Sequence, residues 1–285
     1  MLTHRECFPC FLRQTIIALD RHSESRSFPQ AGHMDIMKEV LLLMREADTD
    51  RPPSYTTTFI HRLIRNRLGH DPYRDIKRRY NSLAMELYPG LRRLVRASRD
   101  PLLTASRLAI AGNIIDFGIF SSVDINGSVT RALENPIAVD DYPAFRQSVE
   151  EAHDILYLLD NSGEIVFDRI LIEELSRLGK KVKAAVKGSP VLNDATREDA
   201  LQVDLASFCE VIDNGSDAVG TILEWTSPEF RSEFGTAELV ISKGQGNFET
   251  LMETEERTYF FFQSKCDVVS KELGLSPCSM LLKKS

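Results

Sequence analysis

The chain has 285 residues, of which 42% are hydrophobic and 27% charged, and its formal net charge is −7 at pH 7. This composition is that of a globular protein, and the acidic balance argues against a general nucleic-acid or anionic-membrane binder. No apolar run approaches the roughly 20 residues that span a bilayer, and the first residues lack the apolar core of a signal peptide. Five scattered cysteines do not form a secreted disulfide framework, so we expect a cytoplasmic protein.

The first hundred residues have the periodicity of helices. Apolar residues recur at helical spacing in four segments, 10–19, 33–45, 56–68 and 73–88. Breaks are expected at Arg51-Pro52-Pro53, Gly69-His70-Asp71-Pro72 and Pro89-Gly90. Residues 91–108 are expected to form one or two more helices, interrupted near Pro101. We therefore predict a helical N-terminal domain over residues 1–100.

Farther along the chain, apolar runs of strand length alternate with amphipathic or turn-rich stretches. The expected strands are 155–159, 182–186, 210–212 and 239–241, and the stretches between them are 165–178, 196–201 and 218–224. Alternation of this kind predicts a mainly parallel sheet with helices on its faces. The predicted fold class is α/β, with a helical part followed by an α/β domain over residues 101–285.

The first candidate site is Asp160-Asn161, directly after the expected strand 155–159. Ligands of parallel sheets bind outside the carboxyl ends of the strands, and Asp and Asn supply the oxygen ligands that Mg²⁺ or Mn²⁺ takes. The Gly turn and the helix start that follow suit an anion. The alternative is that Asp160 only caps the helix.

Asp194 stands in the polar loop after the next expected strand, 182–186. Consecutive strands are usually neighbours, so Asp194 could reach the same metal as Asp160. The alternative is again a helix cap, for a helix that starts at Ala195. Lys187, at the end of the same strand, faces either a phosphate or solvent.

A third polar loop follows the expected strand 239–241. Its two glycines let backbone amides approach a ligand closely, and with the adjacent lysine they suit a phosphate. The loop lacks the Gly-Lys-Ser/Thr ending of a Walker loop and the third glycine of a dinucleotide fingerprint, and a plain turn is the alternative. Its candidate substrate-binding residues are Lys243, Gly244, Gln245, Gly246 and Asn247.

Two further patterns stand earlier in the chain. Asn113 and Asp116 follow a strand-like run, 108–111, and could face the same pocket, although a capping role explains them equally well. Cys7 and Cys10 have the spacing of half a zinc site or of a redox pair. No second cysteine or histidine pair completes a zinc site, and the plain alternative is two buried cysteines at a helix start.

Together these motifs resemble the domain-of-unknown-function family 89, also called the damage-control phosphatase family. The Cys pair is similar to that of the stand-alone, mostly microbial subgroup. The resembling pieces run almost end to end: Cys7-x-x-Cys10 with Gln14, Asp71-Pro72-Tyr73 with Lys77 and Asn81, Gly112-Asn113-Ile114-Ile115-Asp116-Phe117, Asp160-Asn161-Ser162-Gly163-Glu164, Lys187-Gly188-x-Pro190 with Asn193-Asp194-Ala195-Thr196, Lys243-Gly244-x-Gly246-Asn247-Phe248-Glu249, and Lys265-Cys266. Each piece is moderately specific, and their number and order carry the match.

The resemblance implies a helical N-terminal domain over an α/β/α sandwich. It also implies a divalent-metal-dependent phosphatase of sugar phosphates or damaged phospho-cofactors, with Mg²⁺, Mn²⁺, Co²⁺ or Ni²⁺ as cofactor. The family's metal ligands fall on Asp160, Asn161 and Asp194, and its phosphate loop falls on residues 243–247. Its late basic residue, the end of an Arg-Thr-x-Lys motif, falls on Lys265, although the rest of that motif is absent here.

In the expected mechanism, the metal and the protein bind different oxygens of the phosphate. The metal binds one phosphate oxygen, while Lys243, Lys265 and the loop amides neutralise the others. The attacker is either water or an Asp carboxylate that forms an aspartyl-phosphate, and we favour water because a carboxylate that binds metal through both oxygens is a poor nucleophile. Glu164 is a further candidate for orienting the water. The expected catalytic residues are Asp160, Asp194 and Asp116.

Two other classes of function remain open. One is an S-adenosylmethionine-dependent carboxyl methyltransferase, for which Asp213-Asn214-Gly215 is either a ribose ligand or an ordinary turn. The other is a non-catalytic protein that binds a phosphorylated metabolite. The acidic cluster favours catalysis, because a pure anion sensor has little need of three metal-ligating oxygens. In each reading but the methyltransferase the partner is a small phosphorylated metabolite.

Overall fold

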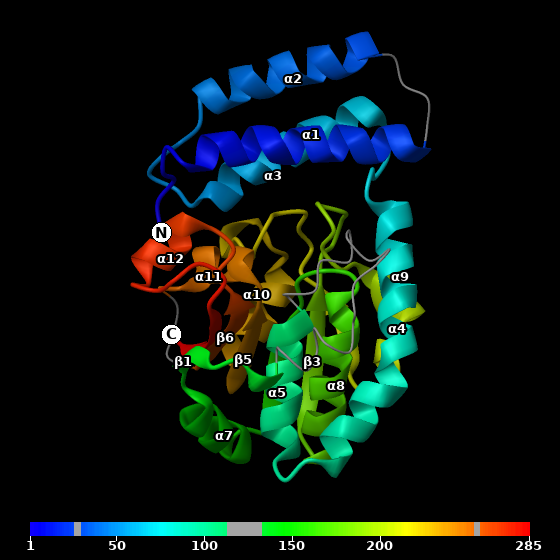
Figure 1. Cartoon of the computed structure of the whole chain (residues 1–285), viewed down its shortest axis with the longest axis vertical. Helices are drawn as coiled ribbons and strands as arrows, with labels where there is room; N and C mark the ends of the chain where they lie inside the picture. Colours follow the sequence, from blue (N-terminus) through cyan, green and yellow to red (C-terminus); the bar gives the residue numbers. More distant parts are fainter. Residues whose placement is uncertain (26–29, 113–132, 254–256) are drawn as a thin grey trace.

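A computed structural model describes residues 1–25, 30–112, 133–253 and 257–285 of the chain. Three helices form a layer at one end of the molecule, and an α/β sandwich lies below them (Figure 1). The layer consists of α1 (Cys7–Ser25), α2 (Gln30–Arg45) and α3 (Pro53–Leu68). These helices share a small core of their own, which includes Phe11, Ile36 and Ile64. None of the described helices is long and apolar enough to cross a bilayer.

The long helix α4 (Arg74–Ala97) descends from this layer along the side of the sandwich, followed by α5 (Pro101–Gly112). The four segments predicted to be helical lie in α1 to α4, which confirms those predictions, with small differences at the ends. The division of the chain at residue 100 stays a prediction. The core of the sandwich includes side chains from α4, such as Tyr88 and Leu91.

Two local predictions are wrong. α4 runs through Pro89-Gly90, where a break was expected, and ends at Ala97. A proline inside a helix costs about 3 kcal/mol, and burial of Leu91 and Val95 in the next turns offsets that cost. The strand-like run Leu108–Ala111 lies in α5 and is fully buried. A helix that is apolar on all sides has no amphipathic period, so a short part of it looks like a buried strand.

The sheet has seven strands in the order β1-β7-β6-β5-β2-β3-β4. All neighbouring pairs are parallel except β6 and β7, so the predicted mainly parallel sheet is confirmed. The bounds are β1 Ile137–Asp140, β2 Asp154–Leu158, β3 Lys181–Val186, β4 Glu210–Asp213, β5 Leu239–Lys243, β6 Thr258–Gln263 and β7 Met280–Lys284. The four predicted strands are β2 to β5. β1, β6 and β7 were not predicted, because short apolar runs carry no period that separates strand from helix.

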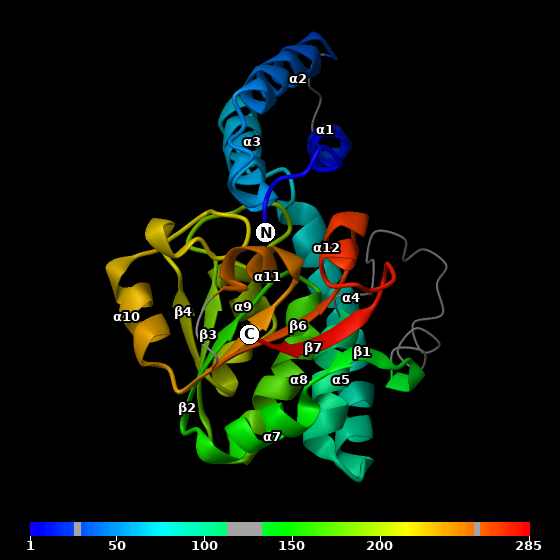
Figure 2. The same cartoon turned by 90° about the vertical axis from the view of Figure 1, so that its left-hand side faces the viewer.

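Helices cover both faces of the sheet, which confirms the predicted three-layer sandwich (Figure 2). One core contains side chains of α4, α5 and α8 with Tyr157 of β2, and the other contains side chains of α10 and α11 with Leu156 of the same strand. Because side chains alternate along β2, this strand contributes to two separate cores. The remaining helices are α7 Tyr142–Glu151, α8 Glu164–Arg177, α9 Arg197–Gln202, α10 Pro228–Thr236, α11 Gln245–Leu251 and α12 Asp267–Glu272.

Gly90 and Gly69 offer a matched test of the α4 and α3 backbones. A Cβ at either position would meet nothing within 4 Å, but Gly69 has a φ of +74° and ends α3, whereas Gly90 lies inside α4. Gly90→Ala is expected to raise the free energy of unfolding by about 0.5–1 kcal/mol, because alanine loses less backbone entropy in a helix. Gly69→Ala is expected to lower it by about 1 kcal/mol or more. Urea unfolding measures both, and a loss of stability in Gly90→Ala contradicts a continuous α4.

Candidate active site

The candidate site lies where the strand order reverses. The chain runs outward from β2 to β3 and β4, and then returns to place β5 on the other side of β2. Such a reversal opens a crevice at the carboxyl ends of the two central strands, where ligands of α/β sheets bind. The three polar loops predicted as candidate sites follow β2, β3 and β5. The fold therefore brings three separate sequence motifs to one edge.

Asp160, Asn161 and Asp194 meet at this edge. The Asn161 Nδ2 donates to Asp160 Oδ2 at 2.7 Å and to Glu164 Oε2 at 3.2 Å. The backbone of Asn161 pairs with that of Asp194, and the Ala195 N–H donates to the Asp160 carbonyl at 2.7 Å. The loops after β2 and β3 are thus hydrogen-bonded to each other, as expected of neighbouring parallel strands.

The carboxylates at this edge are crowded. Burial, together with the negative charges of Glu164 and Asp194, raises the pKa of Asp160 well above its usual range. Burial also raises the pKa of Asp194, against the opposing positive charge of Lys187. A bound cation would relieve this repulsion, since it favours the ionised carboxylates.

Two carboxylates and one amide are a ligand set that fits a hard divalent cation. The described residues contain no group of three or more His, Cys, Asp or Glu side chains placed to hold a metal ion. The fit therefore depends on the Asn161 amide as the third ligand beside Asp160 and Asp194. Asn113 and Asp116, the predicted site residues that follow the run 108–111, lie outside the described residues.

Gly244, in the loop after β5, lies in close contact with the Asp160 carboxylate. Its φ is +83°, and a Cβ at this position would stand 2.0 Å from Asp160 Oδ2. Only glycine fits such a close approach. The Gly244 N–H donates to the Phe261 carbonyl at 3.1 Å, so this amide is engaged within the sheet rather than facing a ligand.

The other predicted phosphate-binding residues divide into two groups. Gln245, Gly246 and Lys265 line the cavity described below. Asn247 is buried, and its amide donates to the Lys243 carbonyl at 2.8 Å and accepts from Thr221 at 2.8 Å. Asn247 thus ties the loop together.

Lys243 is completely buried beneath the edge. Its Nζ contacts Glu164 Oε1 and Asp168 Oδ1, each at 2.6 Å. Asp168 was not singled out in the sequence, although it stands four residues after Glu164 on the otherwise apolar start of α8, and that spacing places the two on one face. The cation of Lys243 is therefore directed into the protein, away from the cavity.

Lys187 is buried in a comparable way behind the second carboxylate. Its Nζ lies 3.4 Å from Asp194 Oδ2 and donates to the Gly220 carbonyl. Burial contradicts the solvent alternative for Lys187, whereas a role toward a phosphate stays a prediction. Lys265, in contrast, is exposed, and its positive charge opposes the rise in the pKa of Asp160.

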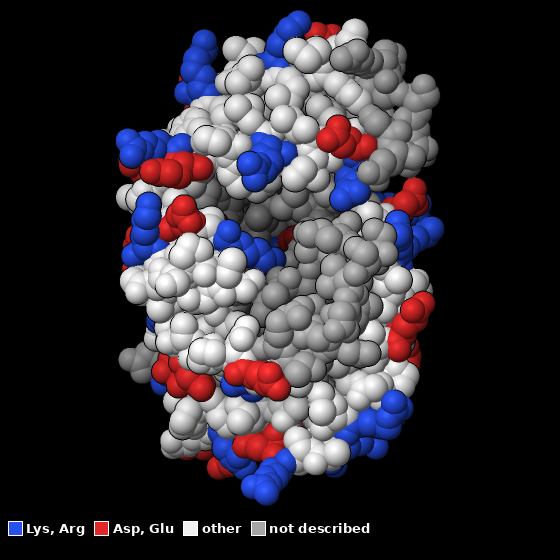
Figure 3. All heavy atoms as spheres, in the orientation of Figure 1, with Lys and Arg blue, Asp and Glu red and all other residues white. Residues whose placement is uncertain are grey.

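A cavity of about 550 Å³ lies between the helical layer and this edge of the sheet. Figure 3 shows the surface hollowed between the layer of α1 to α3 and the sandwich. The floor consists of the acidic residues and the loop after β5, and α1 and α3 supply the other walls. The lining of the cavity includes Cys7, Cys10, Gln14, Ser54, Asp160, Asn161, Asp194, Gln245, Gly246, Glu249, Lys265 and Cys266.

The two N-terminal cysteines belong to this cavity. Cys7 is buried at the first turn of α1, Cys10 is exposed, and Cys266 lines the same cavity. Cys10 Sγ accepts from Gln14 Nε2 at 3.3 Å, and Cys266 Sγ accepts from Gln245 Nε2 at 3.5 Å. No spacing in the sequence could join Cys266 to the pair, because the fold brings it from the loop after β6.

α4 supports the site from the side. The Asn81 carboxamide oxygen accepts from the Gly163 N–H at 2.6 Å, and its nitrogen donates to Asp199 Oδ1 at 2.9 Å. Lys77 lies 2.9 Å from the other oxygen of Asp199, with both side chains buried. The turn that carries Asp160 is therefore held by a helix that precedes it by about eighty residues.

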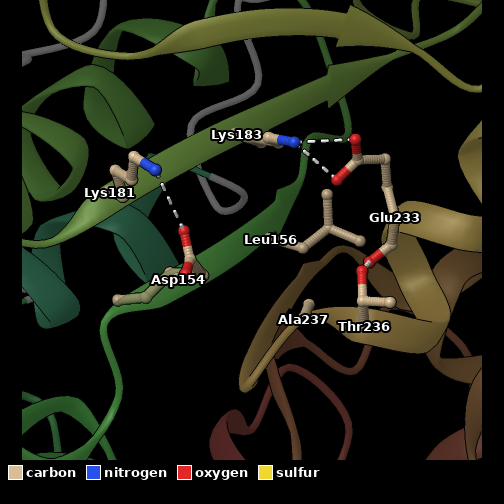
Figure 4. A pocket seen from close by; sticks show the side chains of 8 residues that line it. Asp154, Leu156, Lys181, Lys183, Glu233, Thr236 and Ala237 are labelled. Atoms are coloured by element: carbon tan, nitrogen blue, oxygen red, sulfur yellow. Dashed lines mark hydrogen bonds and ion pairs between the residues drawn. The ribbon is translucent and has the colours of Figure 1, made fainter.

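A smaller pocket, of about 260 Å³, lies at the opposite, amino end of β2 (Figure 4). Asp154 and Lys181 line it, and Lys183 Nζ contacts both carboxylate oxygens of Glu233 at 2.7 Å. The charges in this pocket are paired with one another and partly exposed to solvent. It therefore has the character of an ordinary surface ion-pair cluster.

The contact of Gly244 with Asp160 is testable by one methyl group. Gly244→Ala is expected to lower the free energy of unfolding by more than about 2 kcal/mol, because the new Cβ collides with a carboxylate at a positive φ. Gly246→Ala is the control, since a Cβ there meets nothing closer than 3.3 Å. Urea unfolding compares the two, and equal losses would show that the Gly244 approach is not specific.

Comparison with known proteins shows which family the chain is similar to. The model of the damage-control phosphatase ARMT1-like domain matches residues 3–280. An uncharacterized protein of Methanocaldococcus jannaschii is 32% identical over 95% of this chain and 91% of its own length. Damage-control phosphatases of Pyrococcus horikoshii and Archaeoglobus fulgidus are 32% and 30% identical, over 96% and 86% of this chain and 94% and 87% of their own lengths.

A solved structure is also similar throughout. The crystal structure of a family-89 protein from Pyrococcus horikoshii superposes with a TM-score of 0.92 at 30% identity, covering 100% of this chain and 99% of that one. The names of the two Pyrococcus and Archaeoglobus relatives support a phosphatase of metabolite repair. The resemblance seen in the sequence is thereby confirmed, and the chain belongs to the damage-control phosphatase family, domain-of-unknown-function family 89.

Proposed function

We propose that the protein is a divalent-metal-dependent phosphatase that hydrolyses phosphate monoesters of small metabolites. The observation that carries the proposal is the convergence of Asp160, Asn161 and Asp194 on one cavity that the exposed Lys265 also lines. Oxygen ligands and a cation in the same cavity are what a phosphate monoester and its metal need. The relatives named as damage-control phosphatases support the same class of reaction.

The residues of the chain divide the work of phosphate transfer. Asp160, Asn161 and Asp194 would hold the cation, which supplies a positive charge for one phosphate oxygen when bound. Lys265, which lines the same cavity, neutralises the negative charge on another oxygen. Because both carboxylates serve as ligands, we assign the attack on phosphorus to water rather than to an Asp side chain.

The size of the cavity limits the substrate. A volume of about 550 Å³ suits a molecule of metabolite size. Its walls combine the polar floor with apolar side chains of α1, such as Phe11 and Ile17. We therefore propose a small phosphorylated metabolite as substrate, with the phosphate at the floor and the remainder against α1.

No observation favours the methyltransferase alternative. Asp213, the residue considered as a ribose ligand, lies 2.7 Å from Arg197. The Asn214 carboxamide oxygen accepts from the N–H groups of Gly188 and Ser216. These side chains hold the loops at the ends of β3 and β4.

Asp160→Asn, just after the carboxyl end of β2, tests the proposal against a control at the amino end of the same strand. Protein stripped with EDTA is expected to regain phosphate release from a panel of sugar phosphates and phospho-cofactors when Mg²⁺, Mn²⁺, Co²⁺ or Ni²⁺ is added. Asp160→Asn is expected to lower that release at least about a hundredfold, since a charged ligand is lost. Asp154→Asn, at the exposed amino end of β2, is expected to keep wild-type activity. Release without metal, or full activity in Asp160→Asn, would refute the proposal.

A further inference from the structure

The buried cation below the site has two carboxylate partners. Lys243 Nζ lies 2.6 Å from Glu164 Oε1 and 2.6 Å from Asp168 Oδ1, and the side chain is fully excluded from solvent. Asp168 also accepts from the Tyr157 hydroxyl at 2.7 Å, so it belongs to the interior of the sandwich. Glu164, one turn earlier on α8, faces the candidate site instead. Lys243 therefore joins the interior to the site.

The second carboxylate oxygen of Glu164 accepts a hydrogen bond from Asn161, a candidate metal ligand. Glu164 Oε2 accepts from Asn161 Nδ2 at 3.2 Å, and Asp160 Oδ2 accepts from the same nitrogen at 2.7 Å. Ionised carboxylates only accept hydrogen bonds, so both of them require the amide nitrogen of Asn161 on their side. The carbonyl oxygen of the amide is then the end left for a cation. A carboxamide turned the other way would offer the cation its NH₂ group.

We propose that Lys243 is a positioning residue that acts through Glu164 to fix the orientation of the Asn161 amide, while Lys265 alone of the two contacts the substrate phosphate. The inference rests on the proposed function, which makes Asn161 a metal ligand. It differs from the sequence-based expectation that both lysines bind phosphate. The reason is burial. Lys243 is buried and forms ion pairs with two carboxylates behind the site, whereas Lys265 is exposed and lines the cavity.

The chemistry of Glu164 makes the arrangement sensitive to a single atom. Glu164→Gln preserves size but replaces one acceptor oxygen by an NH₂ group. Because Lys243 only donates, the Gln carbonyl is expected to stay with Lys243 and the NH₂ group to face Asn161. Two NH₂ groups then confront each other, and the Asn161 amide is driven to turn. Loss of a partner that orients a metal ligand typically weakens metal affinity about 10- to 100-fold.

The experiment measures Mn²⁺ affinity by calorimetry on the EDTA-stripped full chain, with thermal unfolding and the kinetics of phosphate release alongside. Lys243→Met and Glu164→Gln are expected to weaken Mn²⁺ binding about 10- to 100-fold. Lys265→Met is expected to keep the Mn²⁺ affinity within about threefold and to raise KM, since it loses a phosphate contact. Asp168→Asn is the matched control, because it disturbs the same buried cation but leaves the path through Glu164 to Asn161 intact.

Wild-type affinity in Glu164→Gln or in folded Lys243→Met would overturn the inference and leave the proposed function standing. Equal weakening in Asp168→Asn would also overturn it, because the effect would then be general damage to the interior. If Lys243→Met does not fold, Glu164→Gln decides alone. Absence of both Mn²⁺ binding and phosphate release in the wild type would overturn the proposed function and this inference with it.

Discussion

The position of β2 in the middle of the sheet governs the rest of the molecule. Because β3 and β5 flank it in parallel, the loops after all three strands open at one edge. The residues of β2 also supply both cores, with Tyr157 on one face and Leu156 on the other. A displacement of this strand would therefore disturb the packing of helices on both faces of the sheet. The same packing fixes the position of a site at its carboxyl end.

Negative charge concentrated at that end needs compensation from inside the protein. Removing a carboxylate from water costs several kcal/mol unless a cation and hydrogen bonds replace the solvent. Lys243 serves Glu164 and Asp168 in this way, and Lys187 serves Asp194. Both lysines lie behind the carboxylates rather than in the cavity. Of these three lysines, only Lys265 lines the cavity on the open side of the acidic edge, where the proposed cation would bind.

The sequence predicts the place of the site better than the direction of its side chains. A strand followed by Asp160-Asn161, and Asp194 after the next strand, suffice to predict that these residues share one edge, because parallel neighbours end together. The direction of Lys243 depends on Asp168, whose polar role inside an apolar helix start shows only when α8 is seen against β5. The course of α4 through Pro89 depends in the same way on tertiary burial, which overrides a local breaker.

The helical layer is a fixed wall of the cavity rather than a loosely attached one. Ser54 of α3 donates to Glu249 of α11 at 2.7 Å, and the Val219 N–H donates to Thr58 of α3 at 2.9 Å. Arg62 and Arg65 of the same helix each lie 2.5 Å from an oxygen of Asp217. These two ion pairs are partly removed from solvent and share one carboxylate. They therefore fix the position of α3 more firmly than single exposed ion pairs would.

A wall held at several points sets the shape of the cavity before a ligand arrives. The sandwich supplies the floor of carboxylates and Lys265, where the proposed phosphate release would take place. α1 supplies Phe11, Gln14 and Ile17 to the wall of the cavity, where the part of the proposed substrate beyond the phosphate would lie. Substitutions in α1 should therefore change which metabolite is accepted more than they change the reaction itself, because the walls and the floor come from different layers of the fold.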